Sequence, residues 1–301
     1  MINRSEKNKE IAGYLDFQET KEKATKVTFI ILKILLIIFI LLFSLFLYMR
    51  YIATTNLITK EYRVIDSALP DNFNGLKIVH ISDLYYKSST TKEKLTTLVK
   101  QINKIKPDII VFTGDLVDTN TLLTDEDKED LISAFNNMHA KVDKYTITGD
   151  KDSEDFNYII SNTDFVLLEN DYELIYAFDL TPILITGISN KSDIQKSFSY
   201  YESENNNKFV FNIVIMHKPD LIEEIIQYNP NIVLAGHSLN GSIKLPFIGG
   251  ILKPSGAKSY YDEYYTINNT KLYISGGIGT NNNKLRLFNR PSFNFYRLNN
   301  K

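Results

Sequence analysis

Five short apolar runs in the chain each end next to a polar residue that can bind a metal ion. The runs are KIVHIS, IIVFTG, YTITG, NIVIM and IVLAG, and the residues that follow them are Asp83, Asp115, Asp150, His217 and His237. Short runs rich in β-branched residues and bounded by Gly, Asp and polar clusters are typical of buried strands. In a layered α/β fold, ligands bind beyond the carboxyl ends of the strands. We therefore expect the five side chains to meet at one edge of a sheet.

Helical patterns lie between these runs. TKEKLTTLVKQINKI carries apolar residues at helical spacing and ends before Pro107, and TDEDKEDLISAFNNM repeats the pattern with Thr124 as its expected N-cap. PDLIEEIIQY links the last two runs, and the Tyr-rich segments KLYISGG and NFYRL are expected to add strands. This alternation predicts β-α-β units and an α/β fold of mixed sheets flanked by helices.

A long apolar segment precedes this region. Residues 27–49 contain one charge, Lys33, and exceed the ~20 residues that cross a bilayer. A buried core helix is the alternative, but an interior helix seldom runs this long without a polar face. A cleaved signal peptide fits less well because no small-residue cleavage site follows. We expect a cytoplasmic tail at 1–26, a membrane helix at 27–49, a linker at 50–72 and a catalytic domain at 73–301.

The charges that flank the apolar segment predict its orientation. The positive charges near its amino-terminal end are Lys21, Lys23, Lys26 and Lys33, and those beyond its other end are Arg50, Lys60 and Arg63. This slight excess favours an inside amino terminus and an extracytoplasmic domain at the cell membrane. The formal net charge of the chain is only -2, so no nucleic-acid partner is expected. The chain has no cysteine, which excludes disulfides, thiolate metal ligands and a cysteine nucleophile.

Five segments together resemble the signature of a known family. SDLYY, TGDLVD, TGDKDS, MHKPD and AGHSLNGSIKLPF are similar, in order, to the blocks D-x-H, G-D-x-x-D, G-N-H-D, H-x-P and G-H-T-H-G-G-Q-x-x-L-P of the calcineurin-like metallophosphoesterases. The resemblance covers about residues 73–301. It extends to the branch that has one amino-terminal membrane segment and that includes enzymes resembling UDP-diacylglucosamine pyrophosphatases. It implies the fold of that family and hydrolysis of a phosphoester or pyrophosphate bond in a phosphorylated small molecule or a lipid-linked substrate.

The resemblance also implies a metal site with losses on one side. Tyr85 and Leu239 stand where the family has histidines, and both of those histidines would bind the same metal. Asp83 keeps a ligand position of that first metal.

The ligands of the other metal are retained, since Asp150 replaces an Asn and keeps an oxygen donor. Asp115, Asp150, His217 and His237 then form a shell of two oxygens and two nitrogens for one divalent ion, Mn²⁺, Zn²⁺ or Fe²⁺. Two ions, with Asp83 as a further ligand, remain the alternative.

Lys151 occupies the position of the family's catalytic G-N-H histidine. An ordinary lysine, with a pKa of ~10.4, is a poor general acid at neutral pH but still neutralises phosphate charge. A second hypothesis makes its ammonium a substitute for the missing first metal, paired with Asp83 or Asp150.

Each of these residues also has a structural interpretation. The aspartates are common turn and capping residues, and His217 and His237 are open to a role in the core. His80 and His139 match no ligand block and are expected to be structural. Three functions remain open: a metal-dependent phosphohydrolase, a catalytically inactive relative that binds a phosphorylated or envelope ligand, and a structural or regulatory partner of a true phosphoesterase.

Overall fold

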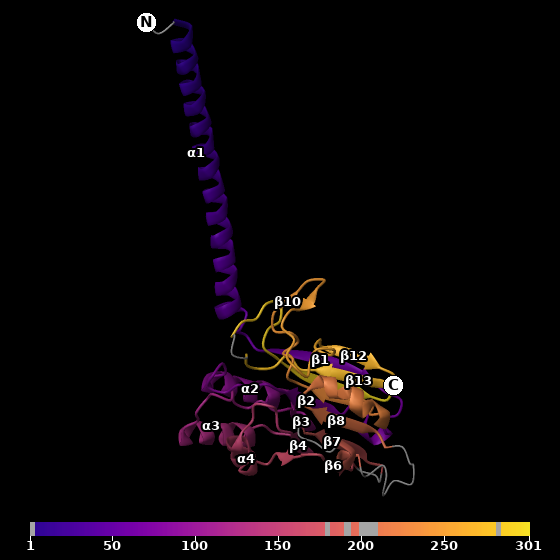
Figure 1. Cartoon of the computed structure of the whole chain (residues 1–301). Helices are drawn as coiled ribbons and strands as arrows, with labels where there is room; N and C mark the ends of the chain where they lie inside the picture. The colour runs from indigo at the N-terminus through magenta and orange to yellow at the C-terminus, as the bar shows by residue number, and fades with distance from the viewer. Residues whose placement is uncertain (1–3, 178–180, 190–193, 199–209, 281–283) are drawn as a thin grey trace. The chain divides into compact units, whose positions relative to one another are not determined.

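The structure is a computed structural model that describes residues 4–177, 181–189, 194–198, 210–280 and 284–301. The chain divides into two compact units, Met1–Met49 and Arg50–Lys301. The second unit, called the globular unit below, holds two six-stranded sheets with helices on their outer faces (Figure 1). The α/β fold with mixed sheets that the sequence predicts is therefore confirmed.

The first sheet has the order β1-β14-β2-β3-β4-β5. Strands β2 to β5 run parallel, and β14 pairs antiparallel with β2 and parallel with β1. The bounds are β1 (Ile58–Ile65), β14 (Ser292–Asn299), β2 (Lys77–Ile81), β3 (Ile109–Phe112), β4 (Asp143–Thr146) and β5 (Val166–Leu167).

The second sheet has the order β12-β13-β9-β8-β7-β6. Its four central strands are parallel, and β12 and β6 are antiparallel edges. The bounds are β12 (Tyr264–Ile267), β13 (Thr270–Ile274), β9 (Ile232–Ala235), β8 (Asn212–Met216), β7 (Ile183–Ile188) and β6 (Asp171–Ile175). A separate hairpin consists of β10 (Lys244–Leu245) and β11 (Gly249–Gly250).

Three apolar clusters hold the layers together. The central cluster joins the facing sides of the sheets, with Ile109 and Val111 from β3 and Ile213 and Ile215 from β8. The outer face of the first sheet packs on α2 (Lys92–Ile105), α3 (Asp125–Asn136) and α4 (Glu154–Ser161), and that of the second on α5 (Ile194–Ser197) and α7 (Ile222–Ile225). Short helical turns at η2 (Asp71–Phe73), η3 (Pro219–Leu221) and η4 (Ile226–Tyr228) complete the unit. Strands buried on both faces read as continuous apolar runs, which is why the sequence reveals them.

The first unit is one helix, α1 (Arg4–Leu47), followed by the π-helical turn η1 (Tyr48–Ile52). Within the described residues it is the one helix long and apolar enough to cross a membrane, and none of its apolar window is buried by the rest of the chain. An exposed apolar surface of this length is unstable in water. The expected tail at 1–26 is helical from Arg4 onward and continuous with the expected span.

The segment expected to be a linker, 50–72, contains a strand. β1 pairs along its full length with β14, and its Tyr62 and Val64 contact the central cluster. The other side chains of β1 are mostly exposed, as is usual at a sheet edge. Because few of its positions are buried, the alternation of apolar and polar residues along β1 is too weak to predict a strand from the sequence.

Thr124 caps α3 as expected. Its hydroxyl accepts a hydrogen bond from the Asp127 backbone N–H at 3.2 Å, and the Asp127 carboxylate accepts one from the Thr124 N–H at 2.8 Å. This reciprocal pair is a capping box. It directs Leu131 and Phe135 into the cluster under the first sheet.

Removal of the cap tests this local structure. We expect Thr124→Ala to lower the free energy of unfolding by about 1 kcal/mol, because the first turn of α3 loses a hydrogen-bond acceptor. Urea unfolding of the full chain in detergent measures it. Thr124→Ser keeps the hydroxyl and should retain most of the stability; equal losses in both variants would contradict the role of the cap.

Candidate metal centre

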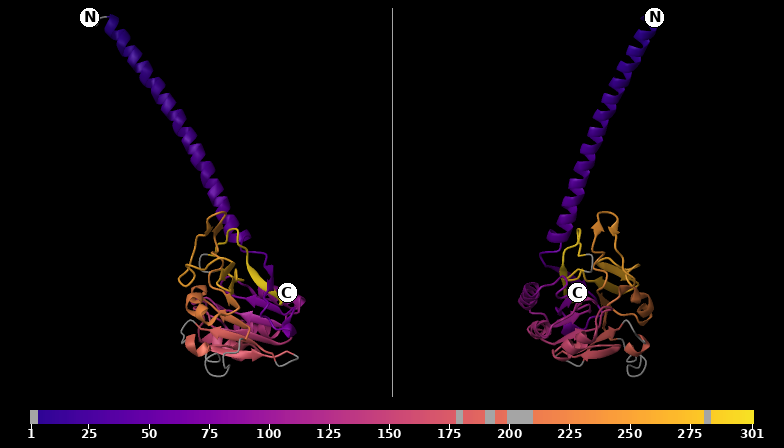
Figure 2. Two further views of the ribbon diagram at one scale, coloured as in Figure 1. Left: turned by 90° about the vertical axis from the view of Figure 1, so that its right-hand side faces the viewer. Right: turned by 60° about the vertical axis from the view of Figure 1, so that its left-hand side comes forward.

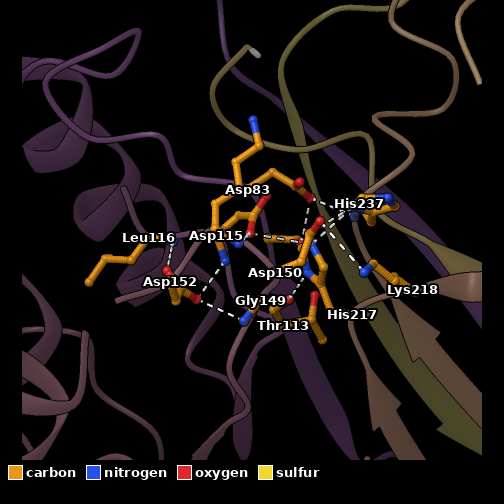
Figure 3. A network of polar contacts seen from close by, with 12 residues as sticks. Asp83, Thr113, Asp115, Leu116, Gly149, Asp150, Asp152, His217, Lys218 and His237 are labelled. Atoms are coloured by element: carbon orange, nitrogen blue, oxygen red, sulfur yellow. Dashed lines mark hydrogen bonds and ion pairs between the residues drawn. The ribbon is translucent and has the colours of Figure 1, made fainter. Parts of the chain in front are cut away.

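The five predicted side chains follow the carboxyl ends of five parallel strands. Asp83 follows β2, Asp115 follows β3, Asp150 follows β4, His217 follows β8 and His237 follows β9. The two sheets therefore contribute residues to the same edge of the sandwich. Figure 3 shows these side chains converging from separate strands.

Four of the five form a compact donor set. One ligand atom each from Asp115, Asp150, His217 and His237 lies within 4.8 Å of the others. Asp150 Oδ1 is 3.0 Å from His217 Nε2 and 3.1 Å from His237 Nδ1, and Asp115 Oδ1 is 3.4 Å from His217 Nε2. Two carboxylates and two imidazoles are a suitable shell for Zn²⁺, Mn²⁺ or Fe²⁺.

Backbone carbonyls determine which histidine nitrogen is free to bind. His217 Nδ1 lies 2.6 Å from the Thr113 carbonyl oxygen, and His237 Nε2 lies 2.8 Å from that of Ser255. A carbonyl only accepts, so these two nitrogens carry the protons. The opposite nitrogens face Asp150 and are the ones that a bound ion would use as ligand atoms. Support of this kind is typical of histidines that bind metals.

The charges of the site favour a bound cation. Burial by itself would lower the pKa of His217, but the charge of Asp115 and hydrogen bonds to Asp115 and Asp150 raise this pKa well above its usual value. The pKa of Asp150 is lowered despite its partial burial, chiefly by hydrogen bonds with the two histidines. The same field that holds a proton on His217 would attract a divalent ion.

The loops that carry these residues adopt a backbone conformation that is unusual outside glycine. Asp83, Tyr85, Asp115, His237 and Leu239 all have positive φ, between 47° and 65°. Non-glycine residues in this region cost of order 1 kcal/mol each and persist where the surroundings hold them, as they do at functional sites. Here the Asp83 N–H donates to the Gly114 carbonyl oxygen at 2.9 Å, which joins two of the loops.

Asp152, which the motif comparison did not single out, joins the same loops. Its carboxylate accepts hydrogen bonds from the backbone N–H groups of Asp115, Leu116 and Gly149, at 2.8 to 2.9 Å. A Cβ on Gly114 would overlap the Gly149 backbone, so this close approach requires glycine. The only signal in the sequence is the final Asp of the TGDKD segment.

Hydrogen-bonding and apolar side chains surround Asp83, where the motif comparison predicts a first metal. The Tyr85 hydroxyl donates to Asp115 Oδ2 at 2.8 Å and lies 3.4 Å from Asp83 Oδ1. Asp83 Oδ2 accepts from the Ser82 hydroxyl at 2.6 Å and from the His237 N–H at 3.0 Å. Leu239 is buried against Gly277. Asp83 thus has two protein donors at Oδ2, lies next to the Tyr85 hydroxyl at Oδ1, and is outside the four-residue donor set.

The second hypothesis expected Lys151 to pair with Asp83 or Asp150. The structure shows a different partner, Asp118. The Lys151 ammonium lies 3.2 Å from Asp118 Oδ1 and 4.9 Å from the centre of the Tyr85 ring. Asp118 is the last residue of the G-D-x-x-D block, and it lies outside the donor set. The Lys151 ammonium therefore pairs with a carboxylate that is not one of the four candidate ligands.

A buried cation near Asp83 comes instead from Arg286. Its side chain is fully buried and donates to the carbonyl oxygen of Gly277 at 3.0 Å. Burial lowers its pKa to about 10, although the negative charge of Asp83 acts in the opposite direction. It matches no motif, so the sequence provides no sign of it.

Two cavities border the donor set. One, of about 250 Å³, is lined by Tyr85, Lys151, His237, Ser238, Ser242, Leu252, Lys253 and Pro254. The other, of about 800 Å³, includes Asp150 and Lys218, and the Lys218 ammonium is 3.6 Å from Asp150 Oδ2. The lysines bring positive charge to both cavities. The motif comparison did not single out Lys218, although it lies in the MHKPD segment, or Lys253.

The remaining two histidines lie outside the donor set, and His80 is structural, as expected. His80 is fully buried between Thr113 and Tyr296, and burial lowers its pKa to about 3. His139 is exposed, and its backbone N–H donates to Asn103.

The family model of the calcineurin-like phosphoesterases matches residues 76–279. The chain belongs to this family. Its members are hydrolases that act on phosphoester bonds, and the matched range includes all five strand-end residues. The family and fold inferred from the five motifs are thereby confirmed.

Known relatives cover most of the chain. A metallophosphoesterase of Bacillus subtilis, YkuE, is 29% identical over 260 residues, 83% of this chain and 88% of that protein. The UDP-2,3-diacylglucosamine pyrophosphatase LpxG of Chlamydia muridarum is 23% identical, over 75% of this chain and 85% of that protein. A transmembrane protein with a metallophosphoesterase domain from Danio rerio is 23% identical, over 74% of this chain and 53% of that protein.

Solved structures also resemble the chain. TT1561 of Thermus thermophilus aligns with a TM-score of 0.45 at 11% identity and covers 68% of this chain and 90% of that one.

The role of Asp152 is open to a direct test. We expect Asp152→Asn to weaken Mn²⁺ binding by about 10 to 100-fold, because an amide has one acceptor oxygen for three backbone donors and the ligand loops loosen. Isothermal titration with Mn²⁺ measures the affinity. Asp155→Asn, three residues away and outside the donor set, serves as the control. An unchanged affinity in Asp152→Asn would show that the three hydrogen bonds to the Asp152 carboxylate do not position the ligands.

Proposed function

We propose that the chain is a membrane-anchored phosphohydrolase that cleaves a phosphoester or pyrophosphate bond with one divalent ion. The observation that carries this proposal is the donor set of Asp115, Asp150, His217 and His237, with both imidazoles oriented by backbone carbonyls. These four residues would hold the ion. When bound, such an ion supplies positive charge that polarises a phosphoryl group.

The other side chains receive roles from their positions. Lys151 and Lys253 line the smaller cavity beside His237 and would neutralise the oxygens of a phosphate there. Asp83 supports the site by accepting the His237 N–H, and it is the further ligand only if a second ion binds. Tyr85 donates to Asp115 and so keeps one oxygen of that carboxylate engaged. Burial and neighbouring charges raise the Tyr85 pKa, so the phenol keeps its proton.

A lipid-linked or other phosphorylated substrate fits this arrangement. One relative is named as a pyrophosphatase of UDP-2,3-diacylglucosamine, an acylated molecule. Residues 27–49 would hold the globular unit at the cell membrane where such molecules lie, and the slight lysine bias supports a position of that unit outside the cytoplasm. The net charge of -2 gives no support to a nucleic-acid substrate.

A second candidate function is binding of the same ligand without turnover. The Tyr85 hydroxyl and Leu239 lie where the family's first metal has its histidines, and the Lys151 ammonium pairs with Asp118. An enzyme that lacks both a second cation and a general acid loses two sources of rate enhancement.

Hydrolysis distinguishes the two functions. We expect the Mn²⁺-loaded full chain in detergent to hydrolyse bis-p-nitrophenyl phosphate, and His237→Ala to lose about 100-fold or more, because the donor set loses a ligand. The exposed His139→Ala is the matched control and should keep full activity. If wild type binds Mn²⁺ but shows no turnover above the His237→Ala background, the binding function is the correct one.

Restoring the two missing histidines tests the number of ions. We expect Tyr85→His/Leu239→His to raise bound Mn²⁺ from about one to about two per chain, since the family's first metal position regains its nitrogen ligands. Elemental analysis after removal of free metal gives the stoichiometry. Tyr85→Phe removes the hydroxyl without adding a ligand and should stay at the wild-type value. A wild type that already binds two ions would contradict the single-ion site.

A further inference from the structure

A pocket in the globular unit collects positive charge apart from the metal group. This basic pocket, defined by Arg50, Lys94 and Lys284, has a volume of about 210 Å³. Hydroxyl groups from Ser88 and Ser89 also line it. It shares no lining residue with the donor set, so it is a separate site.

The cations of the basic pocket have no acidic partner. No Asp or Glu lines it, and the ion pairs among the described residues of the globular unit involve other lysines and arginines. Arg286, fully buried, donates to the carbonyl oxygen of Gly279 in the pocket wall. Partial burial and the charge of Arg286 lower the pKa of Lys94. Like charges gathered in this way are relieved by a bound anion.

The cations keep free donors for such an anion. The Lys94 ammonium donates to the Ser89 carbonyl oxygen at 3.0 Å, and Arg50 Nη1 donates to that of Lys284 at 3.3 Å. An ammonium has three N–H groups and a guanidinium has five, so each side chain is held in place with donors left over. Phosphate oxygens form strong charge-assisted hydrogen bonds with such groups.

The chain connection indicates where the phosphate comes from. Arg50 follows Met49, the last residue of the apolar segment 27–49. In a bilayer spanned by that segment, residue 50 lies at the level of the lipid headgroups. The basic pocket that Arg50 helps to form is then within reach of headgroup phosphates.

Exposed apolar side chains lie on two segments connected to this pocket. One begins at the pocket residue Lys284, and the other is bridged to it. The turn between β10 and β11 carries Phe247 and Ile248, and the segment that begins at Lys284 carries Phe288; all three are at least 66% exposed. The two segments are joined by a bridge between Ile243 and Leu287. In both views of Figure 2 the orange hairpin lies beside the yellow segment of the globular unit. Exposed aromatic and aliphatic side chains beside basic residues are typical of surfaces that enter the membrane interface.

We propose that the basic pocket binds the phosphate of an acidic phospholipid, with Phe247, Ile248 and Phe288 entering the interface beside it. The inference rests on the proposed insertion of residues 27–49 into a bilayer and does not require hydrolysis. The Ser89 N–H donates to the Tyr85 carbonyl oxygen at 3.0 Å. The pocket residue Ser89 therefore belongs to the same loop after β2 as Asp83 and Tyr85, which lie beside the donor set. Binding there would hold the loop after β2, which also carries Asp83, near the membrane that supplies a lipid-linked substrate.

Lipid retention by the full chain tests the proposal. The protein is purified in detergent, mixed with equal amounts of phosphatidylglycerol and phosphatidylcholine, and examined by native mass spectrometry. We expect preferential retention of phosphatidylglycerol, reduced roughly tenfold or more in Lys94→Gln/Lys284→Gln. Lys100→Gln, an exposed lysine on the same helix α2 but outside the pocket, should retain the wild-type preference.

The opposite results are equally clear. Equal retention of the two lipids, or a preference that the double variant keeps, overturns the proposal. A parallel titration with inorganic phosphate separates the sources: tight phosphate binding that depends on Lys94 and Lys284, without lipid preference, overturns the lipid assignment in favour of a free-phosphate site. Bound Mn²⁺ is measured in the same samples. A variant that keeps its Mn²⁺ but loses the lipid has an intact metal site, so its loss of lipid is specific to the basic pocket. Thermal unfolding checks the double variant, and Lys284→Gln alone replaces it if it unfolds early.

Discussion

Repulsion among three carboxylates is the constraint on which the rest of the site depends. Asp83 and Asp115 are fully buried and Asp150 lies beside them at neighbouring strand ends. Buried like charges this close are unstable without compensation. For Asp83, the compensation comes from Ser82, Tyr85, the His237 N–H and the nearby Arg286. For Asp115 and Asp150 it comes from the imidazoles, and a divalent ion would complete it.

This division of charge gives a physical account of the altered motifs. Tyr85 and Leu239, which stand where the motif comparison places histidines, are a buried phenol and a buried apolar side chain, and the nearby Asp83 carboxylate accepts hydrogen bonds from protein donors. The other half of the site keeps all four donors with ring nitrogens facing each other at 3.2 Å. Protein groups thus balance the charge around Asp83, whereas Asp115, Asp150 and the two imidazoles form a donor set whose charge a cation would complete.

The loops around the site connect it to the basic pocket. Asp83, Tyr85 and Ser89 belong to one connection after β2, and the N–H of Gly279 in the pocket wall donates to the Asp83 carbonyl oxygen at 2.8 Å. A Cβ on Gly279 would overlap the Leu84 carbonyl, so the two segments approach as closely as backbone allows. Metal group and pocket are therefore built on shared, strained backbone, and neither is an independent surface feature.

The sequence by itself determined the family, the strands and the strand-end residues, because buried parallel strands are continuous apolar runs and their ends carry recognisable motifs. It also located the Thr124 cap and the apolar segment 27–49, which are local patterns. Only the tertiary structure decided four other features. They are the edge strand β1, the hydrogen bonds from backbone N–H groups to the Asp152 carboxylate, the pairing of Lys151 with Asp118, and the burial of Arg286. Each depends on contacts between segments distant in sequence, and charge pairs and close backbone approaches leave no periodic trace along the chain.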